Sequence, residues 1–102
     1  MNILDINRDR LHSLCHQYHV KSLYAFGSVT DETLKADSDI DLVVDIDTDD
    51  PLDYSEFYFG LKFQLEALFK RQIDLLESNS IRNPFLKTSI DKTKVLVYGK
   101  GH

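Results

Sequence analysis

The sequence predicts an α/β (α+β) fold, a small mixed β-sheet flanked by helices. Short apolar runs, each about as long as one strand, alternate with longer segments whose apolar residues recur at the helical period. The length of 102 residues is enough for one core without disulfides or metal. We therefore expect a single domain over residues 1–98, followed by a frayed tail at 99–102.

Helices are predicted where the apolar spacing is helical. The first covers residues 5–19, with apolar residues at i, i+3, i+4 and i+7 from Leu11. The longest covers 52–70 and follows Pro51, a residue suited to the first turn of a helix. A short helix is expected over 84–91.

Strands are predicted at 20–26, 39–46, 72–76 and 94–98, where apolar residues form short runs. The second of these strands has two unlike faces, because side chains alternate across a strand. The face expected to enter the core carries Ile40, Leu42, Val44 and Ile46. The opposite face carries Asp39, Asp41, Val43, Asp45 and Asp47, of which we interpret the last two acids as solvated strand-end residues.

The acidic face predicts a metal-dependent site beside a phosphate-binding turn. Neighbouring carboxylates repel one another, and a divalent cation such as Mg²⁺ relieves that repulsion. Asp74 lies within another short apolar run and is the candidate third carboxylate beside Asp39 and Asp41. Gly27 and Ser28 close the first strand, where glycine permits a tight turn and serine offers a hydroxyl and an N–H to phosphate oxygens.

These motifs resemble the minimal nucleotidyltransferases, small members of the polymerase-beta-like nucleotidyltransferase superfamily. The resemblance extends from about residue 20 to about residue 98 and rests on Phe26-Gly27-Ser28, Ser38-Asp39-Ile40-Asp41-Leu42 and Ile73-Asp74-Leu75. It implies a polymerase-beta-like fold with a two-Mg²⁺ site. The implied catalytic and metal-binding residues are Asp39, Asp41 and Asp74, and the implied nucleotide-binding residues are Gly27, Ser28 and Ser38.

The resemblance also implies a function. We expect a Mg²⁺-dependent transfer of a nucleoside monophosphate, AMP from ATP in the first instance, to a hydroxyl acceptor. Domains of this size resemble MntA-type antitoxins, whose partners are HEPN-domain toxins and which in some cases add AMP to a tyrosine of the toxin. The chain is too short for a substantial acceptor-binding domain, so the acceptor is expected on another protein.

The alternative is a catalytically weak antitoxin or scaffold of the same fold. Many relatives have a basic residue shortly after the Gly-Ser pair, whereas this chain has Val29-Thr30-Asp31-Glu32. In addition, Phe59 and Phe63 lie on the face of the longest helix that points away from the core. This pair indicates a contact with a partner or a second copy of the chain, unless the terminal segment folds over it.

Other groups of residues have two interpretations each. Arg82 and Lys87 either reach the phosphates or ribose of a nucleotide or are ordinary surface cations. Asp74 could instead meet water or the neighbouring Lys70 and Arg71. A possible zinc-binding group is interpreted as the flank of an amphipathic helix, since no second ligand cluster completes it; its members are His12, Cys15, His16 and His19.

The composition limits which classes of binding partner and which cellular compartment we expect. The net charge of −5 argues against binding to long nucleic acid, because Lys and Arg supply most of that affinity. The single cysteine, Cys15, excludes an internal disulfide and fits a reducing compartment. No signal peptide or membrane-spanning run is visible. We therefore expect a cytoplasmic protein without a membrane partner.

Overall fold

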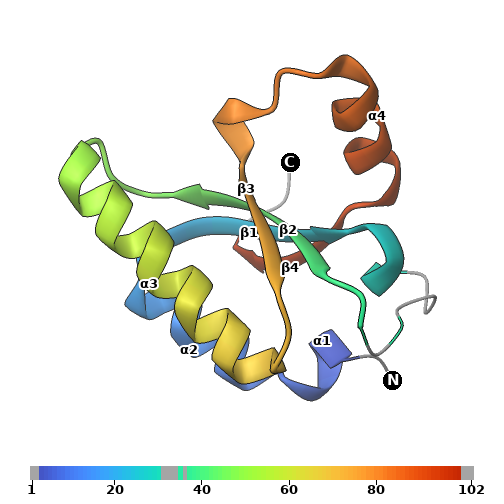
Figure 1. Cartoon of the computed structure of the whole chain (residues 1–102). Helices are drawn as coiled ribbons and strands as arrows, with labels where there is room; N and C mark the ends of the chain where they lie inside the picture. Colours follow the sequence, from blue (N-terminus) through green and yellow to red (C-terminus); the bar gives the residue numbers. More distant parts are fainter. Residues whose placement is uncertain (1–2, 31–34, 36, 100–102) are drawn as a thin grey trace.

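The computed structural model describes residues 3–30, 35 and 37–99 and contains every predicted strand (Figure 1). The elements in chain order are α1 (Ile3–Ile6), α2 (Arg8–Gln17), β1 (Val20–Phe26), η1 (Gly27–Thr30, a 3₁₀ turn), β2 (Ile40–Ile46), α3 (Pro51–Phe69), β3 (Ile73–Glu77), η2 (Ser78–Ser80, a 3₁₀ turn), α4 (Pro84–Thr93) and β4 (Val95–Gly99). The predicted α+β architecture is confirmed.

The four strands form one mixed sheet in the order β3-β2-β1-β4. β1 runs antiparallel to β2 and β4, whereas β2 and β3 are parallel and are joined by the crossover helix α3. The register places Phe26 opposite Asp41 in one pair of strands and Asp41 opposite Asp74 in the other. The end of β1 and the beginnings of β2 and β3 therefore meet at one place on the sheet.

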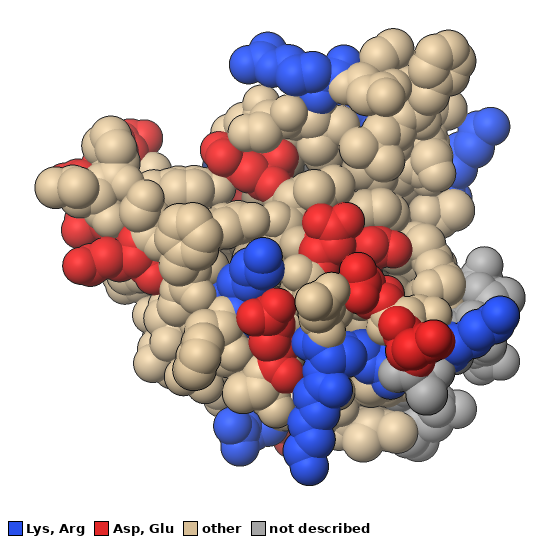
Figure 2. Space-filling view, in the orientation of Figure 1, with Lys and Arg blue, Asp and Glu red and all other residues tan. Residues whose placement is uncertain are grey.

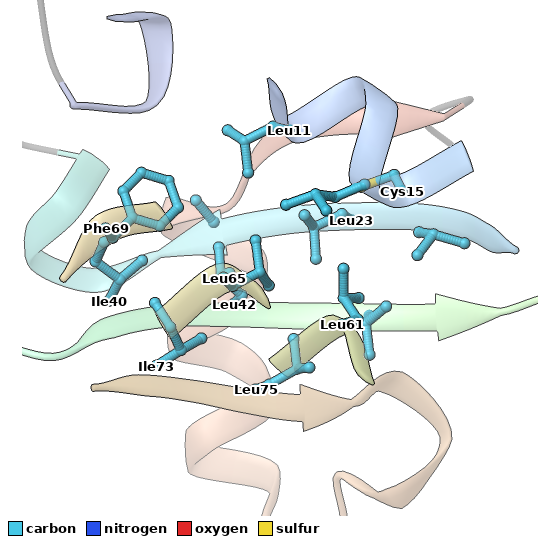
Figure 3. Packing of buried hydrophobic residues seen from close by; sticks show 14 of the residues in the cluster. Leu11, Cys15, Leu23, Ile40, Leu42, Leu61, Leu65, Phe69, Ile73 and Leu75 are labelled. Atoms are coloured by element: carbon cyan, nitrogen blue, oxygen red, sulfur yellow. The ribbon is translucent and has the colours of Figure 1, made fainter. Parts of the chain in front are cut away.

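The main core lies between one sheet face and the helices α2 and α3 (Figure 3). α3 contributes the fully buried Leu61 and Leu65, which pack in the same cluster as Leu11 of α2 and Leu23 of β1. Burying each such side chain stabilises the fold by about 1.5–3 kcal/mol. The other sheet face carries a smaller cluster of Phe26, Val43 and Ile90, where α4 covers the strands.

The predicted first helix is two helices, α1 and α2, because Asn7 interrupts it. The Asn7 side-chain Nδ2 donates to the carbonyl oxygen of Ile3 at 2.9 Å, a local bond that competes with the helical pattern. The second helix ends at Gln17, earlier than predicted, and His19 then takes a left-handed φ of 58° before β1 begins.

The predicted tail begins one residue too early, because Gly99 is the last residue of β4. Gly99 pairs with Ser22 of β1 at a φ of +97°. A Cβ at this position would lie 2.2 Å from the carbonyl oxygen of Lys21, so close pairing requires glycine here. Residues 100–102 lie outside the described residues.

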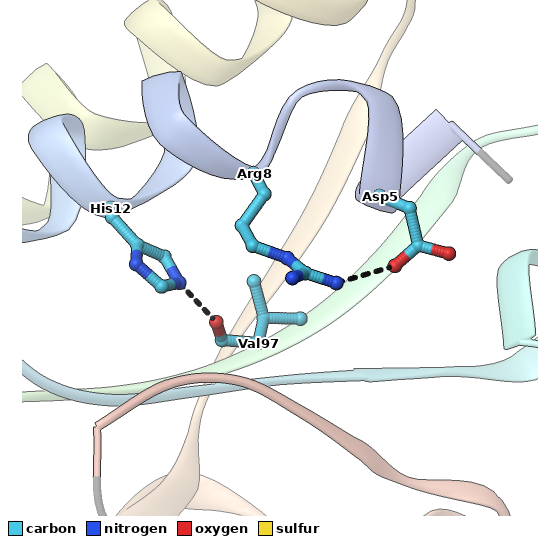
Figure 4. Close-up of polar contacts among 4 residues, drawn as sticks. All are labelled: Asp5, Arg8, His12 and Val97. Carbon is cyan, nitrogen blue, oxygen red and sulfur yellow. Dashed lines mark hydrogen bonds and ion pairs between the residues drawn. The ribbon is translucent and has the colours of Figure 1, made fainter. Parts of the chain in front are cut away.

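Two histidines near the N-terminus make structural contacts, one through a hydrogen bond and one through ring stacking. Figure 4 shows the first of them, His12. His12 Nε2 donates to the Val97 carbonyl oxygen at 3.1 Å and so ties α2 to β4, while Arg8 pairs with Asp5 at 3.3 Å. The ring of His19 stacks on Phe57 with 4.4 Å between centroids. Within the described part of the chain, no three or more His, Cys, Asp or Glu side chains form a group that could hold a metal ion.

α3 is capped at its start and leaves two aromatic side chains in solvent. Asp50 accepts hydrogen bonds from the backbone N–H groups of Leu52 and Asp53, and Pro51 occupies the first turn. Phe59 and Phe63 are 64% and 69% exposed, so the described part of the terminal segment does not cover them. None of the described helices has both the length and the apolar character needed to cross a bilayer.

Truncating a side chain on the buried face of α3 should lower the stability of the fold far more than truncating one on its exposed face. Leu61→Ala should lower the free energy of unfolding by about 2–5 kcal/mol, because it opens a cavity in the core. Phe63→Ala, two residues away on the exposed face, should change it by less than about 0.5 kcal/mol. Urea unfolding followed by circular dichroism measures both, and equal losses would contradict this assignment of the faces.

Candidate active site

Asp41 of β2 and Asp74 of β3 form the centre of the candidate site. They are register partners on the sheet face opposite the main core, and Asp41 is half-buried while Asp74 is exposed. The pKa of the Asp41 carboxyl is raised, first by burial, then by the negative charges of Asp74 and Asp39 and by a hydrogen bond with Asp74. Figure 2 shows acidic side chains gathered between α3 and α4. The structure thus pairs Asp41 with Asp74 and places Asp39 near enough to add to the negative charge on Asp41.

Gly27 places the backbone bend directly against this carboxylate pair. Its φ is +75°, and a Cβ built on it would lie 2.8 Å from Oδ2 of Asp41. Glycine is therefore required both for the turn and for the close approach of the acid. Ser28 follows in η1, and the Thr30 hydroxyl donates to the Gly27 carbonyl oxygen at 2.7 Å, which tightens the bend.

Asp39 and Ser38 lie on the segment that enters β2. Asp39 is exposed and Ser38 is half-buried. The Ser38 hydroxyl accepts from the Lys35 N–H, and the Ser38 N–H donates to the Lys35 carbonyl oxygen, each at 3.1 Å. These two bonds close a small turn, so the Ser38 hydroxyl supports the segment that carries Asp39. Its role with a nucleotide stays a prediction.

Arg71 holds the segment that leads to Asp39, a role that no pattern in the sequence predicts. Its Nη1 donates to the carbonyl oxygens of Lys35 at 3.0 Å and Ser38 at 3.1 Å, which holds the chain just before Asp39. Of the alternative partners of Asp74, neither Lys70 nor Arg71 forms an ion pair with it among the described residues, whereas its exposure leaves it open to water. No sequence signal reveals these bonds, because they depend on the pairing of β2 with β3.

The donor set fits Mg²⁺. None of Asp39, Asp41 and Asp74 has a Lys or Arg ion-pair partner among the residues that the structure describes. In the same residues, no group of three or more His, Cys, Asp or Glu forms a preformed metal cage. Mg²⁺ suits such a set, because it binds through one or two carboxylates and takes its other ligands from water and substrate phosphates.

Tyr58 connects α3 to the strand that carries Asp74. Its hydroxyl donates to the carbonyl oxygen of Leu75. Burial raises the pKa of the Tyr58 hydroxyl, and the negative charges of Asp74 and Glu77 raise it further. This contact depends on the tertiary structure, because it requires α3 to lie against β3.

Adding a methyl group at Gly27 should disturb the site in two separable ways. Gly27→Ala should destabilise the protein by about 1–2 kcal/mol through its left-handed backbone alone, with a further cost from contact with Asp41. Unfolding measurements in wild type and in an Asp41→Ala background separate the two parts. The cost should be smaller in the Asp41→Ala background, and equal costs would contradict the contact.

The raised pKa of Asp41 predicts a pH-dependent stability. Between its ordinary value of 3.8 and the raised folded value, the folded protein keeps a proton that the unfolded chain has released, so stability falls as pH rises through this window. Without divalent ions, Asp41→Asn should therefore raise the urea midpoint at pH 7 and leave it unchanged below the ordinary value. Asp47→Asn, at an exposed position just after the end of β2, is the control. A gain that is equal at both pH values would overturn this explanation.

Comparisons with known proteins agree with the geometry. The family model described as "Polymerase beta, Nucleotidyltransferase" matches residues 9–102. Two proteins of Methanocaldococcus jannaschii, each named "Putative protein adenylyltransferase", are 35% and 36% identical over 95 residues, which are 93% of this chain and 94% of each relative.

Solved structures share the fold. One described as "Structure of putative minimal nucleotidyltransferase" is 26% identical, has a TM-score of 0.74 and is matched over 93% of this chain and 95% of its own. A toxin-antitoxin crystal structure with AMP-PNP is 23% identical with a TM-score of 0.70, over 92% of this chain and 74% of that one. The motifs, the mixed sheet and the sequence relatives agree, and the chain belongs to the polymerase beta nucleotidyltransferase family.

Proposed function

We propose that this nucleotidyltransferase transfers AMP from ATP to a hydroxyl group of a partner protein, with Mg²⁺ bound at Asp39, Asp41 and Asp74. One observation carries the proposal: Asp41, which is paired with the like-charged Asp74, lies against the bend at Gly27. The relatives that are 35% and 36% identical carry the name of protein adenylyltransferases, which supports AMP as the transferred group.

Each part of the site has a task in this reaction. The acceptor oxygen forms a bond to the α-phosphorus of ATP, the bond to the bridging oxygen of the β-phosphate breaks, and pyrophosphate leaves. When bound, two Mg²⁺ ions lower the pKa of the acceptor hydroxyl and neutralise the charge on pyrophosphate. Gly27 and Ser28 hold the triphosphate, and Asp74, which is exposed, accepts the proton of the acceptor hydroxyl.

The partner is proposed to be a HEPN-domain toxin, with this chain as its antitoxin in the cytoplasm. A structure described as a tri-AMPylated Shewanella oneidensis HEPN toxin in complex with MNT antitoxin matches 96% of this chain and 74% of that chain, with 20% identity and a TM-score of 0.64. Asp74 lies on β3, one of the two edge strands of the sheet. A side chain of another protein can therefore approach it from solvent.

A second candidate function is neutralisation of a partner by contact, with little catalysis. The exposure of Phe59 and Phe63 favours this candidate, because a pair of aromatic rings on one helix face is typical of a protein contact. Use of the same pair for self-association stays a prediction. Both candidates require a partner, and they differ in whether MgATP is bound and consumed.

Removing single carboxylates tests the proposed function. Asp41→Asn and Asp74→Asn should each lower the transfer of labelled AMP to the partner by at least about 100-fold, because they remove charge that stabilises the transition state. Asp47→Asn, on the same face but beyond the end of β2, should retain the rate within about threefold. Transfer is measured with labelled ATP, Mg²⁺ and cell extract or purified partner.

Calorimetric titration of MgATP separates the two candidates. The proposed enzyme should give metal-dependent heat that is lost in Asp41→Asn, and Mg²⁺ should raise the melting temperature of wild type more than that of the variant. A contact-only antitoxin should give no such heat while both proteins still capture the partner. Normal AMP transfer by Asp41→Asn would refute the assignment of these acids.

A further inference from the structure

A groove of about 370 Å³ runs along the β3 edge of the sheet, between the first half of α3 and the end of β3. Tyr54, Tyr58 and Phe59 line it from α3, and Leu76 and Glu77 line it from β3. Among its lining residues, all of which the structure describes, Glu77 alone is charged. The groove therefore combines three aromatic rings with one carboxylate.

The aromatic rings of the groove are fixed relative to one another. Tyr54 and Tyr58 are stacked with 6.3 Å between ring centroids, and Phe59 meets Tyr58 edge-on at 5.0 Å. The Tyr58 hydroxyl donates to the carbonyl oxygen of Leu75, which holds this ring against β3. The Phe59 side chain is 64% exposed, so a ligand can reach its ring from solvent. Because the face of an aromatic ring attracts cations, these rings favour a positively charged ligand.

Glu77 is half-buried and has no cationic partner among the described residues. The Ser80 hydroxyl donates to Oε2 of Glu77 at 3.1 Å and so orients the carboxylate. Burial raises the pKa of the Tyr54 hydroxyl, and the negative charge of Glu77 raises it further, so this charge acts within the groove. Partly buried carboxylates are usually paired, because burial penalises an isolated charge. A cation bound in the groove would supply the missing partner.

The chain around the groove is also acidic. Between Lys35 and Lys62 the sequence contains no Lys, Arg or His, whereas Asp50 caps the start of α3 and Asp53 lies in its first turn. Figure 2 shows acidic side chains gathered at this end of α3. Lys62, one turn after Tyr58 on α3, is outside the lining of the groove. The local charge therefore draws a cationic group toward the groove.

A cavity on the other side of the acidic pair has the opposite character. It has a volume of about 220 Å³ and lies between α4 and the sheet, over β1 and β2. Lys87 and Lys94 line it, and Asp91 pairs with Lys94 at 3.3 Å. The basic side chains around α4 are visible in Figure 2. A cationic side chain is therefore attracted to the groove at β3 and not to this cavity.

The groove adjoins the candidate active site. Glu77 follows Asp74 by three residues on β3, which is about 10 Å along the strand. The negative charges of both acids raise the pKa of the Tyr58 hydroxyl after burial has done so, which places both near that hydroxyl. A protein that is held in the groove by one side chain therefore lies beside the site.

We propose that the groove binds an arginine side chain of the partner protein, with the guanidinium group over the ring of Phe59 and paired with the carboxylate of Glu77. This inference rests on the proposed function, because it requires a protein partner. Arginine suits the groove better than lysine, since a planar guanidinium stacks on aromatic rings and donates two parallel hydrogen bonds to a carboxylate. Arginine and tyrosine are also enriched in protein interfaces. The contact anchors the partner and takes no part in the transfer reaction.

Titration of the isotope-labelled protein with N-acetyl-arginine amide, followed by NMR, tests the inference. Wild type should bind this probe at least about fivefold more tightly than N-acetyl-citrulline amide, whose side chain has nearly the same shape but no charge. Glu77→Gln and Phe59→Ala should each weaken the arginine probe at least about fivefold, because they remove the carboxylate charge and the exposed ring. Glu56→Gln and Phe63→Ala, also exposed on α3 but outside the groove lining, are the matched controls and should bind as wild type does.

The outcomes separate this inference from the proposed function, because probe binding requires neither MgATP nor AMP transfer. Wild type that binds no arginine probe, or binds the citrulline probe equally well, overturns the groove assignment alone. The same holds if Glu77→Gln binds the probe as Glu56→Gln does. Wild type that binds the probe but transfers no AMP overturns the proposed function alone.

Transfer kinetics with the purified partner give a second readout. Glu77→Gln should raise the KM for the partner at least about threefold, while kcat and the heat of MgATP binding stay as in wild type, because the lost contact holds the partner and not the nucleotide. An unchanged KM, or a loss confined to kcat, would count against an anchoring role. Circular dichroism confirms that each variant is folded.

Discussion

Two like-charged side chains, Asp41 and Asp74, are held next to each other by the parallel pairing of β2 and β3. The partial burial of Asp41 and, after it, the negative charge of Asp74 raise the pKa of the Asp41 carboxyl, and both oppose folding with Asp41 ionised. The same strands bury Ile40 and Ile73 on the opposite face. Since a slip of one residue would exchange the faces, the register that fills the core is also the register that places the acids together.

The remaining parts of the site follow from this pairing. Parallel strands need a crossover, and α3 provides it while burying Leu61 and Leu65 against the sheet. β1 ends opposite the beginning of β2, so the bend at Gly27 arrives beside Asp41. Arg71, just before β3, bonds backbone carbonyls before β2 and steadies the segment that carries the third acid. Three distant chain segments therefore meet at one sheet end.

Periodicity predicts the strands and the acidic face well, because both follow from local alternation of side chains. The strand predicted at 20–26 is the observed β1, and the predicted faces of β2 are those observed. The break at Asn7 was missed, since one side-chain bond to Ile3 decides it. The bonds of Arg71 were missed for another reason: they join segments that become neighbours only after the strands pair. The local sequence pattern therefore predicts the strands and the acidic residues. The hydrogen bonds that hold these residues in place can be found only from the tertiary structure.

The charged side chains around the acidic pair differ in sign between its two sides. Lys87 and Lys94 line the cavity over β1 and β2, whereas Glu77 lines the groove at the β3 edge. The side chains of the described residues therefore give the two sides of the acidic pair opposite charges, basic over β1 and β2 and acidic at the β3 edge.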